Sequence, residues 1–325
     1  MKNSINGKSV IVTGGLGFVG HNLVLSLVND YNCRVTVIDN GLNSNSNSLK
    51  SIEGKYQLVL KSVLDETIYE LFLGADYIFH LACVQIAHSS SDPKMDLQVN
   101  AESTLKILEF LRQNKESSQL KRFVYTSSAS VYGSAKEYPS SEEGSTKVLS
   151  HYAATKLLGE NYTIIYNKQY GIPTSSVRYS NVYGFGQSPK NPYCGVMGKF
   201  IHNALEGKKL GIIGDGQQTR DYTFITDAVS ATILAAVHSH ADGGVFNIGT
   251  GIEASVNSIA ETISKYIPNV EIERLPPRDI DNIRRRVMDI TLIQERLGWE
   301  PLVSINEGIQ KTIFWYRSNN LIDSQ

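Results

Sequence analysis

The sequence predicts an α/β protein built on a doubly wound parallel sheet, with a smaller mixed α/β cap formed by its C-terminal part. Through the first half of the chain, short β-branched runs alternate with amphipathic stretches, as they do in strand–helix–strand units. The strand-like runs are almost continuously apolar, which is typical of a sheet covered by helices on both faces. The last third mixes strands and helices without regular alternation, and this suits a small cap.

The elements of this fold can be assigned in chain order. The predicted strands are residues 9–13, 34–38, 57–60, 77–81, 123–127 and 174–179. Apolar residues at helical spacing predict helices over residues 17–28, 95–111 and 152–166. Residues 184–195 are rich in Gly, Pro and Asn, so we expect a loop there, and loops at strand ends often carry binding residues.

The bulk composition argues against several classes of protein. The chain has 325 residues, 41% of them hydrophobic and 19% charged, an ordinary globular balance that is long enough for two lobes. A net charge of -1 argues against a general nucleic-acid-binding protein. We expect no membrane span and no secretory signal, because no apolar stretch is long enough for either. The three cysteines lack metal or disulfide spacing, so we expect no metal and a cytoplasmic location.

A glycine-rich turn follows the first predicted strand and opens a helix. Gly14, Gly17 and Gly20 form the pattern G-x-x-G-x-x-G. Such a turn needs bare backbone that can approach a pyrophosphate, and the helix N-terminus then offers free N–H groups to the phosphates. The pattern in this context predicts a dinucleotide-binding (Rossmann) sheet.

An acidic residue ends the second predicted strand. Asp39 lies where a carboxylate can accept hydrogen bonds from both hydroxyls of a cofactor ribose. The same carboxylate would repel a 2′-phosphate, and the following residues 40–42 supply no arginine to hold one. The sequence therefore favours NAD over NADP.

A Tyr-x-x-x-Lys pair lies in the predicted helix that begins at residue 152. Tyr152 and Lys156 are four residues apart, so the phenol and the ammonium share one helix face. A lysine cation and a positive nicotinamide ring would lower the pKa of the phenol and make it a usable base. The preceding strand ends in Ser127 and Ser128, at the edge of the sheet where ligands bind. A strand-end hydroxyl there can hold a sugar oxygen while the phenolate removes its proton.

These motifs resemble those of the extended short-chain dehydrogenase/reductase family, in its NAD-dependent nucleotide-sugar epimerase/dehydratase branch of the UDP-glucose/UDP-galactose 4-epimerase type. The resemblance covers nearly the whole chain. Besides the glycine turn, Tyr-x-x-x-Lys and Asn100, it rests on the following segments: FHLAC at 79–83, RYSNVYG at 178–184, GDGQQTRDY at 214–222, NIGTG at 247–251 and LGWEP at 297–301.

The resemblance implies roles for individual residues. Ser128 would be the strand-end hydroxyl, Tyr152 the base, and Lys156 its partner and a ligand of the nicotinamide ribose. The implied cofactor-binding residues are Gly14, Gly17, Phe18, Val19, Asp39, Asn40, Ser62, Val63, Leu81, Ala82, Tyr152, Lys156 and Tyr179. The implied substrate-binding residues are Ser128, Asn181, Arg220, Arg278 and Arg286.

Three positions bear on how closely the family pattern applies. Ser62 replaces an aspartate of the adenine site, which puts a side-chain contact to adenine there in doubt. Residues 184–187 read GFGQ instead of G-P-R-Q and so lack an arginine. Arg286 falls near the position that limits sugar size in the galactose epimerases. A bulky arginine there would disfavour N-acetylated sugars, although a solvated arginine in the run 284–286 is an equal alternative.

The family also implies an organisation and a partner. An NAD-binding domain would span residues 1–176, with about 219–249 returning to it. A substrate-binding domain would span 177–325, mainly 177–218 and 250–325. The substrate would be a nucleoside diphosphate sugar. The chain would form a homodimer through a four-helix bundle of the helices near 95–111 and 151–166.

Three functions remain open. In the first, a C4 epimerase, Tyr152 takes the proton of the sugar 4-hydroxyl, NAD accepts the hydride, and the 4-keto sugar turns over before the hydride returns. The second is a 4,6-dehydratase or decarboxylase that shares the first oxidation. The third is a non-catalytic NAD-binding regulator.

The family's dehydratases have an Asp-Glu pair after the catalytic hydroxyl, and its decarboxylases keep a glutamate there. Ala129 and Ser130 stand there instead, which favours the epimerase unless Glu142 or Glu143 supplies a carboxylate.

Overall fold

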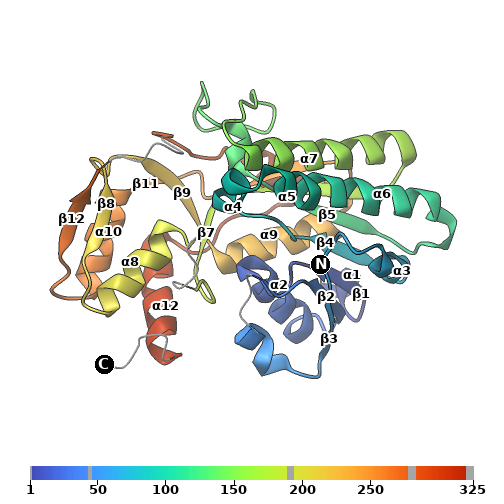
Figure 1. The fold of residues 1–325 in the computed structure, drawn as a ribbon, viewed down its shortest axis with the longest axis horizontal. Helices are drawn as coiled ribbons and strands as arrows, with labels where there is room; N and C mark the ends of the chain where they lie inside the picture. The colour runs from blue at the N-terminus through green and yellow to red at the C-terminus, as the bar shows by residue number, and fades with distance from the viewer. Residues whose placement is uncertain (1, 43–45, 189–193, 277–282, 320–325) are drawn as a thin grey trace.

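The protein consists of a larger sheet-based part and a smaller C-terminal part that lie side by side (Figure 1). A computed structural model describes residues 2–42, 46–188, 194–276 and 283–319. The large sheet has seven strands in the order β10-β6-β5-β4-β1-β2-β3, and every neighbouring pair is parallel. Its strands are β1 (Ser9–Thr13), β2 (Arg34–Asp39), β3 (Tyr56–Leu60), β4 (Tyr77–His80), β5 (Arg122–Ser128), β6 (Thr174–Tyr179) and β10 (Val245–Ile248).

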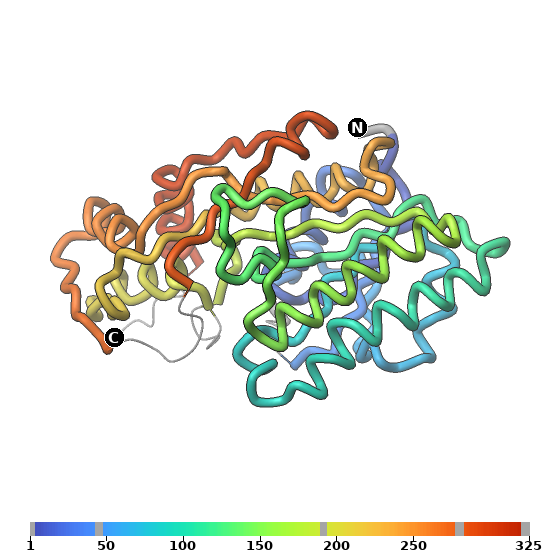
Figure 2. The backbone as a smooth tube through the Cα atoms, turned by 90° about the horizontal axis from the view of Figure 1, so that it is seen from above, coloured from blue at the N-terminus to red at the C-terminus, as the bar shows by residue number. Residues whose placement is uncertain are grey.

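Helices cover both faces of this sheet, as Figures 1 and 2 show. One face packs against α2 (Phe18–Asn29) and α9 (Ile225–Val237), and the other against α3 (Tyr69–Leu73), α6 (Ser103–Gln113) and α7 (His151–Tyr170). Successive strand residues point to opposite faces, and both faces are buried. This is why the strands are nearly continuous apolar runs and why the core divides into two clusters.

The predicted helix over 95–111 is a composite of three segments. α5 (Pro93–Leu97) leads into a π-helical turn, η3 (Gln98–Glu102), and then into α6. The Asp92 side chain caps α5 by accepting a hydrogen bond from the amide of Met95 at 3.0 Å. The remaining elements of the larger part are α1 (Lys2–Ile5), η1 (Ser46–Ile52), η2 (Glu66–Ile68), α4 (Ile86–Ser91), η4 (Lys115–Ser117), η5 (Ala129–Tyr132) and η6 (Ser239–Ala241).

The smaller part contains two small sheets and its own helices. A three-stranded sheet has the order β11-β9-β7, and a two-stranded sheet pairs β12 with β8. The elements are β7 (Asn181–Tyr183), α8 (Val196–Leu205), β8 (Leu210–Ile213), β9 (Thr219–Phe224), β11 (Glu253–Ser255), α10 (Val256–Tyr266), β12 (Ile272–Leu275) and α12 (Ile305–Ser318). The helix α11 (Thr291–Leu297) packs against β10 and η6 of the larger part. The predicted fold, a doubly wound sheet with a smaller mixed cap, is confirmed.

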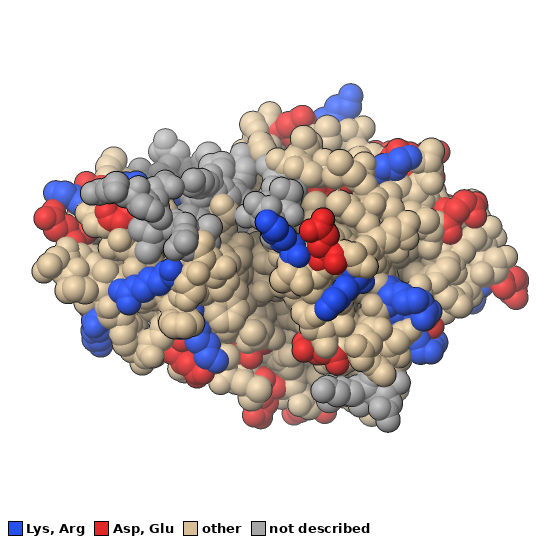
Figure 3. Space-filling view, turned by 90° about the horizontal axis from the view of Figure 1, so that it is seen from below, with Lys and Arg blue, Asp and Glu red and all other residues tan. Residues whose placement is uncertain are grey.

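The chain passes between the two parts more than once. After β9 it returns to the large sheet, where α9 covers one face and β10 pairs with β6. The division into domains at residue 176 stays a prediction. Within the described ranges, no helix is both long and apolar enough to cross a membrane. Lys, Arg, Asp and Glu side chains are interspersed on the face that Figure 3 shows, without one extended area of a single sign.

Candidate active site

A cavity of about 480 Å³ lies at the carboxyl ends of the central strands, where the glycine turn, the end of β5 and the first turns of α7 meet. It brings together all but two of the sequence-predicted site residues. Those that line it are Gly14, Gly17, Phe18, Val19, Asp39, Asn40, Ser62, Val63, Leu81, Ala82, Ser128, Tyr152, Lys156, Tyr179, Asn181 and Arg286.

The glycine turn requires bare backbone at two positions. Gly14 has a φ of +70°, and a Cβ there would lie 2.7 Å from the Ala82 amide nitrogen. A Cβ on Gly20 would overlap the carbonyl oxygen of Gly14, where the helix packs against the strand. Glycine at these positions lets α2 begin directly beneath the cavity. The turn therefore has the open backbone and the helix N-terminus that a cofactor pyrophosphate requires.

Asp39 lies at the end of β2 and is held by backbone amides. Its Oδ2 accepts a hydrogen bond from Leu16 N at 3.0 Å, and its Oδ1 accepts one from Gly41 N at 2.9 Å. These contacts fix the carboxylate at the cavity wall, where a ribose would lie. Lys61 also lines the cavity, but its ammonium lies 3.2 Å from the Asp65 carboxylate. The nearby cation is thus already paired, and the residues at this end fit NAD.

A buried hydrogen-bonded chain supports the loop that faces the glycine turn. Ser103 Oγ donates to Val99 O at 2.7 Å, so it accepts from His80 Nε2 at 3.3 Å. His80 Nδ1 then accepts the Thr13 hydroxyl at 2.8 Å, and Thr13 Oγ1 accepts from Ala82 N at 3.2 Å. This network assigns the proton of His80 to Nε2. Burial lowers the pKa of His80 to about 3, with the charge of Lys156 acting in the same direction, so the ring is neutral.

The three residues with predicted catalytic roles come from two elements. Ser128 ends β5, and its Oγ accepts a hydrogen bond from Ser130 N at 3.2 Å. Tyr152 and Lys156 lie in the first turns of α7, which Ser150 caps by accepting from Ala153 N at 3.1 Å. Lys156 is 2% exposed, and its ammonium donates to Thr126 O at 2.9 Å. One wall of the cavity therefore carries all three side chains.

The pKa of Tyr152 reflects the burial of its side chain at the cavity wall. Burial raises the pKa of the phenol above its usual range, although a hydrogen bond from Ser128 and the charge of Arg286 lower it. Lys156 Nζ lies 5.9 Å from the centre of the Tyr152 ring, and burial lowers the pKa of this lysine. A positive charge brought close to the phenol would lower this pKa.

The predicted substrate residues divide into three groups. Asn181 and Arg286 line the cavity beside Ser128. Arg220 does not line it, because its Nη1 donates to the carbonyl oxygens of Thr219 and Ile283, each at 2.8 Å. Arg278 lies outside the described residues. The substrate-binding roles that the resemblance implies for Arg220 and Arg278 stay predictions.

Several residues of the site were not singled out from the sequence. Those that line the cavity include Lys61 and Gln85. The cavity also includes Ser127 and Ser130, which are buried, and neither hydroxyl has a hydrogen-bond partner within the described part of the chain. The sequence already placed Ser127 beside Ser128 at a strand end, and strand ends face the ligand crevice.

A second buried network lies behind the catalytic wall. Glu160 and Arg178 form a bidentate pair with N–O distances of 2.6 and 2.9 Å. Arg178 also donates to Tyr132 Oη at 2.7 Å, which donates to Asn247 Oδ1 at 2.7 Å. The backbone N–H of Asn247 donates to Glu142 Oε1 at 2.7 Å. This network joins α7, β6 and β10 to the loop after β5.

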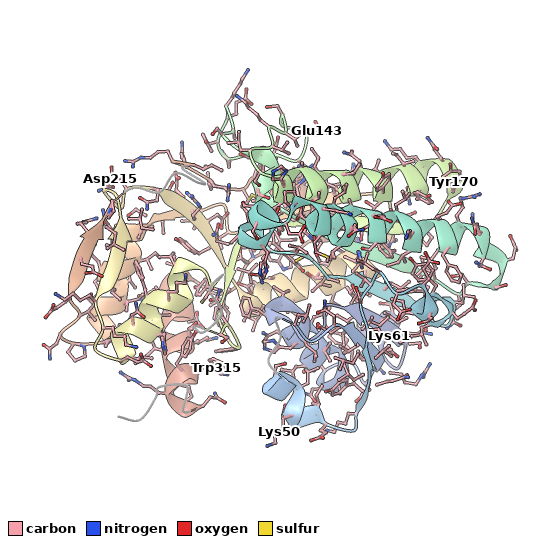
Figure 4. The ribbon with its side chains drawn as sticks, viewed as in Figure 1. Lys50, Lys61, Glu143, Tyr170, Asp215 and Trp315 are labelled. Carbon is pink, nitrogen blue, oxygen red and sulfur yellow. The ribbon has the colours of Figure 1, made fainter. Side chains whose placement is uncertain are left out.

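The two glutamates that could have served a lyase do not reach the cavity. Glu142 is committed to Asn247 and is not part of the lining. Glu143 is exposed and points outward from the loop above α7 (Figure 4). Among the described lining residues, Asp39 is the one carboxylate, and it belongs to the ribose end. The described residues hold no group of three or more His, Cys, Asp or Glu suited to a metal ion.

Comparison with known proteins gives consistent matches over almost the whole chain. The family model described as the NAD dependent epimerase/dehydratase family matches residues 10–249. A UDP-glucose 4-epimerase of Mycolicibacterium smegmatis is 34% identical, covering 95% of this chain and 99% of the relative. A UDP-N-acetyl-alpha-D-glucosaminuronate decarboxylase of Bacillus cytotoxicus is 33% identical, covering 95% and 98%. The crystal structure of a Thermotoga maritima UDP-glucose 4-epimerase with UDP-glucose superposes with a TM-score of 0.88, at 31% identity and covering 96% and 99%.

Proposed function

Because this chain belongs to the NAD-dependent epimerase/dehydratase family, whose members are nucleotide-sugar enzymes, we propose that it epimerises the sugar of a nucleoside diphosphate sugar at C4. The reaction oxidises C4 to a ketone and then reduces it from the opposite face. NAD, the cofactor of the family, supplies the hydride acceptor and donor when bound. The residues of the chain bind the sugar, position its 4-hydroxyl and move the proton.

Each member of the catalytic set has a distinct task in this proposal. Tyr152 removes the proton of the 4-hydroxyl while Ser128 hydrogen-bonds to the same oxygen. Lys156 contributes its positive charge and holds the nicotinamide ribose, and Thr126 O orients its ammonium. Burial raises the pKa of the Tyr152 phenol, and the positive ring of bound NAD would lower it. The phenol would thus become a base chiefly in the complex that can also accept the hydride.

The residues that follow Ser128 are the reason for proposing an epimerase and not a lyase. A dehydratase must remove the C5 proton and expel the 6-hydroxyl, and this needs a second acid/base pair near C5 and C6. The decarboxylases of the family keep a glutamate after the catalytic hydroxyl. Ala129 and Ser130 follow Ser128, and neither titrates near neutral pH. Asp39 is held by Leu16 and Gly41 at the other end of the cavity. With no described carboxylate beside the sugar, return of the hydride is the available fate of a 4-keto intermediate.

We further propose a UDP-sugar as substrate, since the relatives compared above, two UDP-glucose 4-epimerases and a UDP-N-acetyl-alpha-D-glucosaminuronate decarboxylase, are all named for UDP-sugars. Arg286 lines the cavity near Tyr152 and is placed to contact the sugar. A bulky arginine there would disfavour an N-acetylated sugar. A panel of UDP-, dTDP-, GDP- and CDP-sugars analysed by product NMR tests the proposal. A C4 epimer is the expected product, whereas a 4-keto-6-deoxy sugar or a decarboxylated sugar would replace the epimerase with a lyase.

We also propose that the chain forms a homodimer through α5 and α7. Met95, Leu97, Leu158 and Ile165 are 36–47% exposed on these helices, although they are large and apolar. Figures 1 and 2 place α5 and α7 together on one side of the sheet. Leu158 and Ile165 are seven residues apart and lie on one helix face. Pairing of this surface with a second copy would remove these side chains from water.

A further inference from the structure

A buried carboxylate lies beside the catalytic helix, and the proposed mechanism does not use it. Asp96, in α5, has no exposed surface. Its Oδ2 accepts a hydrogen bond from Thr155 Oγ1 at 2.8 Å, and its Oδ1 accepts one from Asn100 Nδ2 at 2.5 Å. Burying a carboxylate is costly unless neighbouring groups compensate for the lost water. The buried carboxylate of Asp96 must therefore be stabilised by the groups around it.

The two partners of Asp96 connect it to the catalytic set from two sides. Thr155 directly precedes Lys156 in α7, and its shortest hydrogen bond is the one to Asp96. Asn100 accepts from Val84 N at 2.7 Å and donates to Val84 O at 3.1 Å. It thereby fixes the segment that follows the cavity-lining residues 81–83. Asp96 is the group that both contacts share.

The charge of Asp96 bears on Lys156. The Lys156 ammonium is buried, its hydrogen-bond acceptor is the neutral carbonyl of Thr126, and it lies 5.1 Å above the Tyr125 ring. A buried cation needs a counter-charge to remain ionised. Burial lowers the pKa of Lys156, whereas Cys83 and, more weakly, Asp96 raise it. Cys83 and Asp96 also add to the rise that burial causes in the pKa of Tyr152, and burial raises the pKa of Asp96 itself. The other titratable groups that face these residues are His80, Cys83, Tyr125, His151, Glu160 and Arg286.

We propose that Asp96 is a positioning residue for the catalytic set: through Thr155 and Asn100 it holds α7 in register against the Val84 segment, and it buries a carboxylate beside the start of α7. The inference rests on the proposed function for the identity of the catalytic set, but its test needs no turnover. Asp96 itself touches neither substrate nor cofactor.

The substitution Asp96→Asn separates the charge from the contacts. An asparagine can accept from Asn100 with its oxygen and donate to Thr155 Oγ1 with its amide. The Thr155 hydroxyl can then donate to Tyr152 O, which lies 3.1 Å away. Glu102→Gln is the matched control, because Glu102 lies on the same composite helix and pairs with Lys106 at its surface, 3.1 Å away. Asp96→Ser is a second neutral variant in case Asp96→Asn fails to fold.

The measurement is an ultraviolet titration of the NAD-bound protein. The spectrum of each variant minus that of the same variant with Tyr152→Phe isolates ionisation of the Tyr152 phenol. Removing a negative charge stabilises the phenolate, so the apparent pKa of Tyr152 should fall by on the order of 1 unit in the Asp96 variants. Glu102→Gln should leave it unchanged. An unchanged Tyr152 titration in Asp96→Asn, or in Asp96→Ser, would overturn the assignment even if the enzyme proves to be an epimerase.

Discussion

The Lys156 ammonium donates a hydrogen bond of 2.9 Å to the carbonyl oxygen of Thr126. Thr126 lies two residues before Ser128 on β5, so this bond ties the catalytic helix to the strand that carries the hydroxyl. A lysine held in this way cannot swing toward solvent without losing its hydrogen bond to the buried carbonyl oxygen of Thr126. The relative positions of Ser128 and Tyr152 are therefore set by the protein before any ligand binds.

Loss of the Tyr152 hydroxyl should abolish most turnover and leave the fold intact. Tyr152→Phe removes the oxygen that accepts the proton, and positioned acid–base groups typically contribute 10²–10⁴-fold, so a decrease in kcat of about that size is expected. NAD affinity, measured by calorimetry, should change little. Tyr162→Phe, which alters a half-buried tyrosine on the same helix, is the control and should keep full activity. If the Tyr152→Phe protein kept most of its activity, the assignment of Tyr152 as the base would be wrong.

NAD should bind much more tightly than NADP. Asp39 is held against the ribose end of the cavity by two backbone amides, and the ammonium of Lys61 is paired with Asp65. A 2′-phosphate would meet a fixed negative charge without a free cation nearby. Calorimetry should show that Asp39→Asn weakens NAD binding and narrows the preference over NADP, whereas the exposed Asp30→Asn should do neither. Equal affinities of the wild-type protein for the two cofactors would contradict this prediction.

The neutral state of His80 should make the fold sensitive to mild acid. Its pKa is about 3 in the folded protein and about 6.5 in the unfolded chain, so the unfolded chain binds the extra proton between these values. The contribution of His80 to the free energy of unfolding is therefore complete above about pH 6.5. Below that pH the free energy of unfolding falls toward pH 3, by up to about 1.4 kcal/mol per pH unit from this group. Denaturant unfolding at several pH values measures the slope. His80→Gln should reduce it in that window, and the exposed His240→Gln should not; equal slopes in wild type and His80→Gln would contradict the assignment.

The proposed dimer surface can be tested by one charge. Leu158→Asp places a carboxylate on the exposed apolar face of α7 and should convert a dimer to a monomer, as measured by light scattering after size-exclusion chromatography. Leu302→Asp is the control, since Leu302 is 84% exposed in the smaller part of the molecule. A monomeric wild-type protein, or a Leu158→Asp protein that remains dimeric, would count against this surface.

The large sheet could be predicted from the sequence because each strand carries its own signal. β1, β4 and β5 are short apolar runs at the places that the pattern indicated, and burial on both faces explains that pattern. The composite helix from α5 to α6 was predicted as one regular helix. Its π-turn contains Asn100, whose side chain is bonded to the backbone of Val84, and a tertiary contact of this kind leaves no mark in local periodicity.

The candidate site was predictable only where a motif also determines the backbone position. The glycine turn and Tyr-x-x-x-Lys place their residues in the cavity because each motif lies at the start of a helix beside a strand end. The motif that contains Arg220 lacks this property. Residues 284–286 run along β9, where the backbone amide of Thr219 donates to the carbonyl oxygen of Arg284 at 3.0 Å. The Arg220 side chain donates to the carbonyl oxygen of Ile283, the residue just before this run. The sequence alone does not show that these two segments lie together.

In the proposed epimerisation the hydride leaves C4 of the sugar and returns to C4, and no other group is lost. The accepted nucleotide sugar can be labelled with deuterium at C4 and the product analysed by NMR and mass spectrometry. We expect a C4 epimer that keeps the deuterium at C4, has the mass of the substrate, and forms without net consumption of NAD. A product that is lighter by water or carbon dioxide, or one that has lost the label from C4, would contradict it.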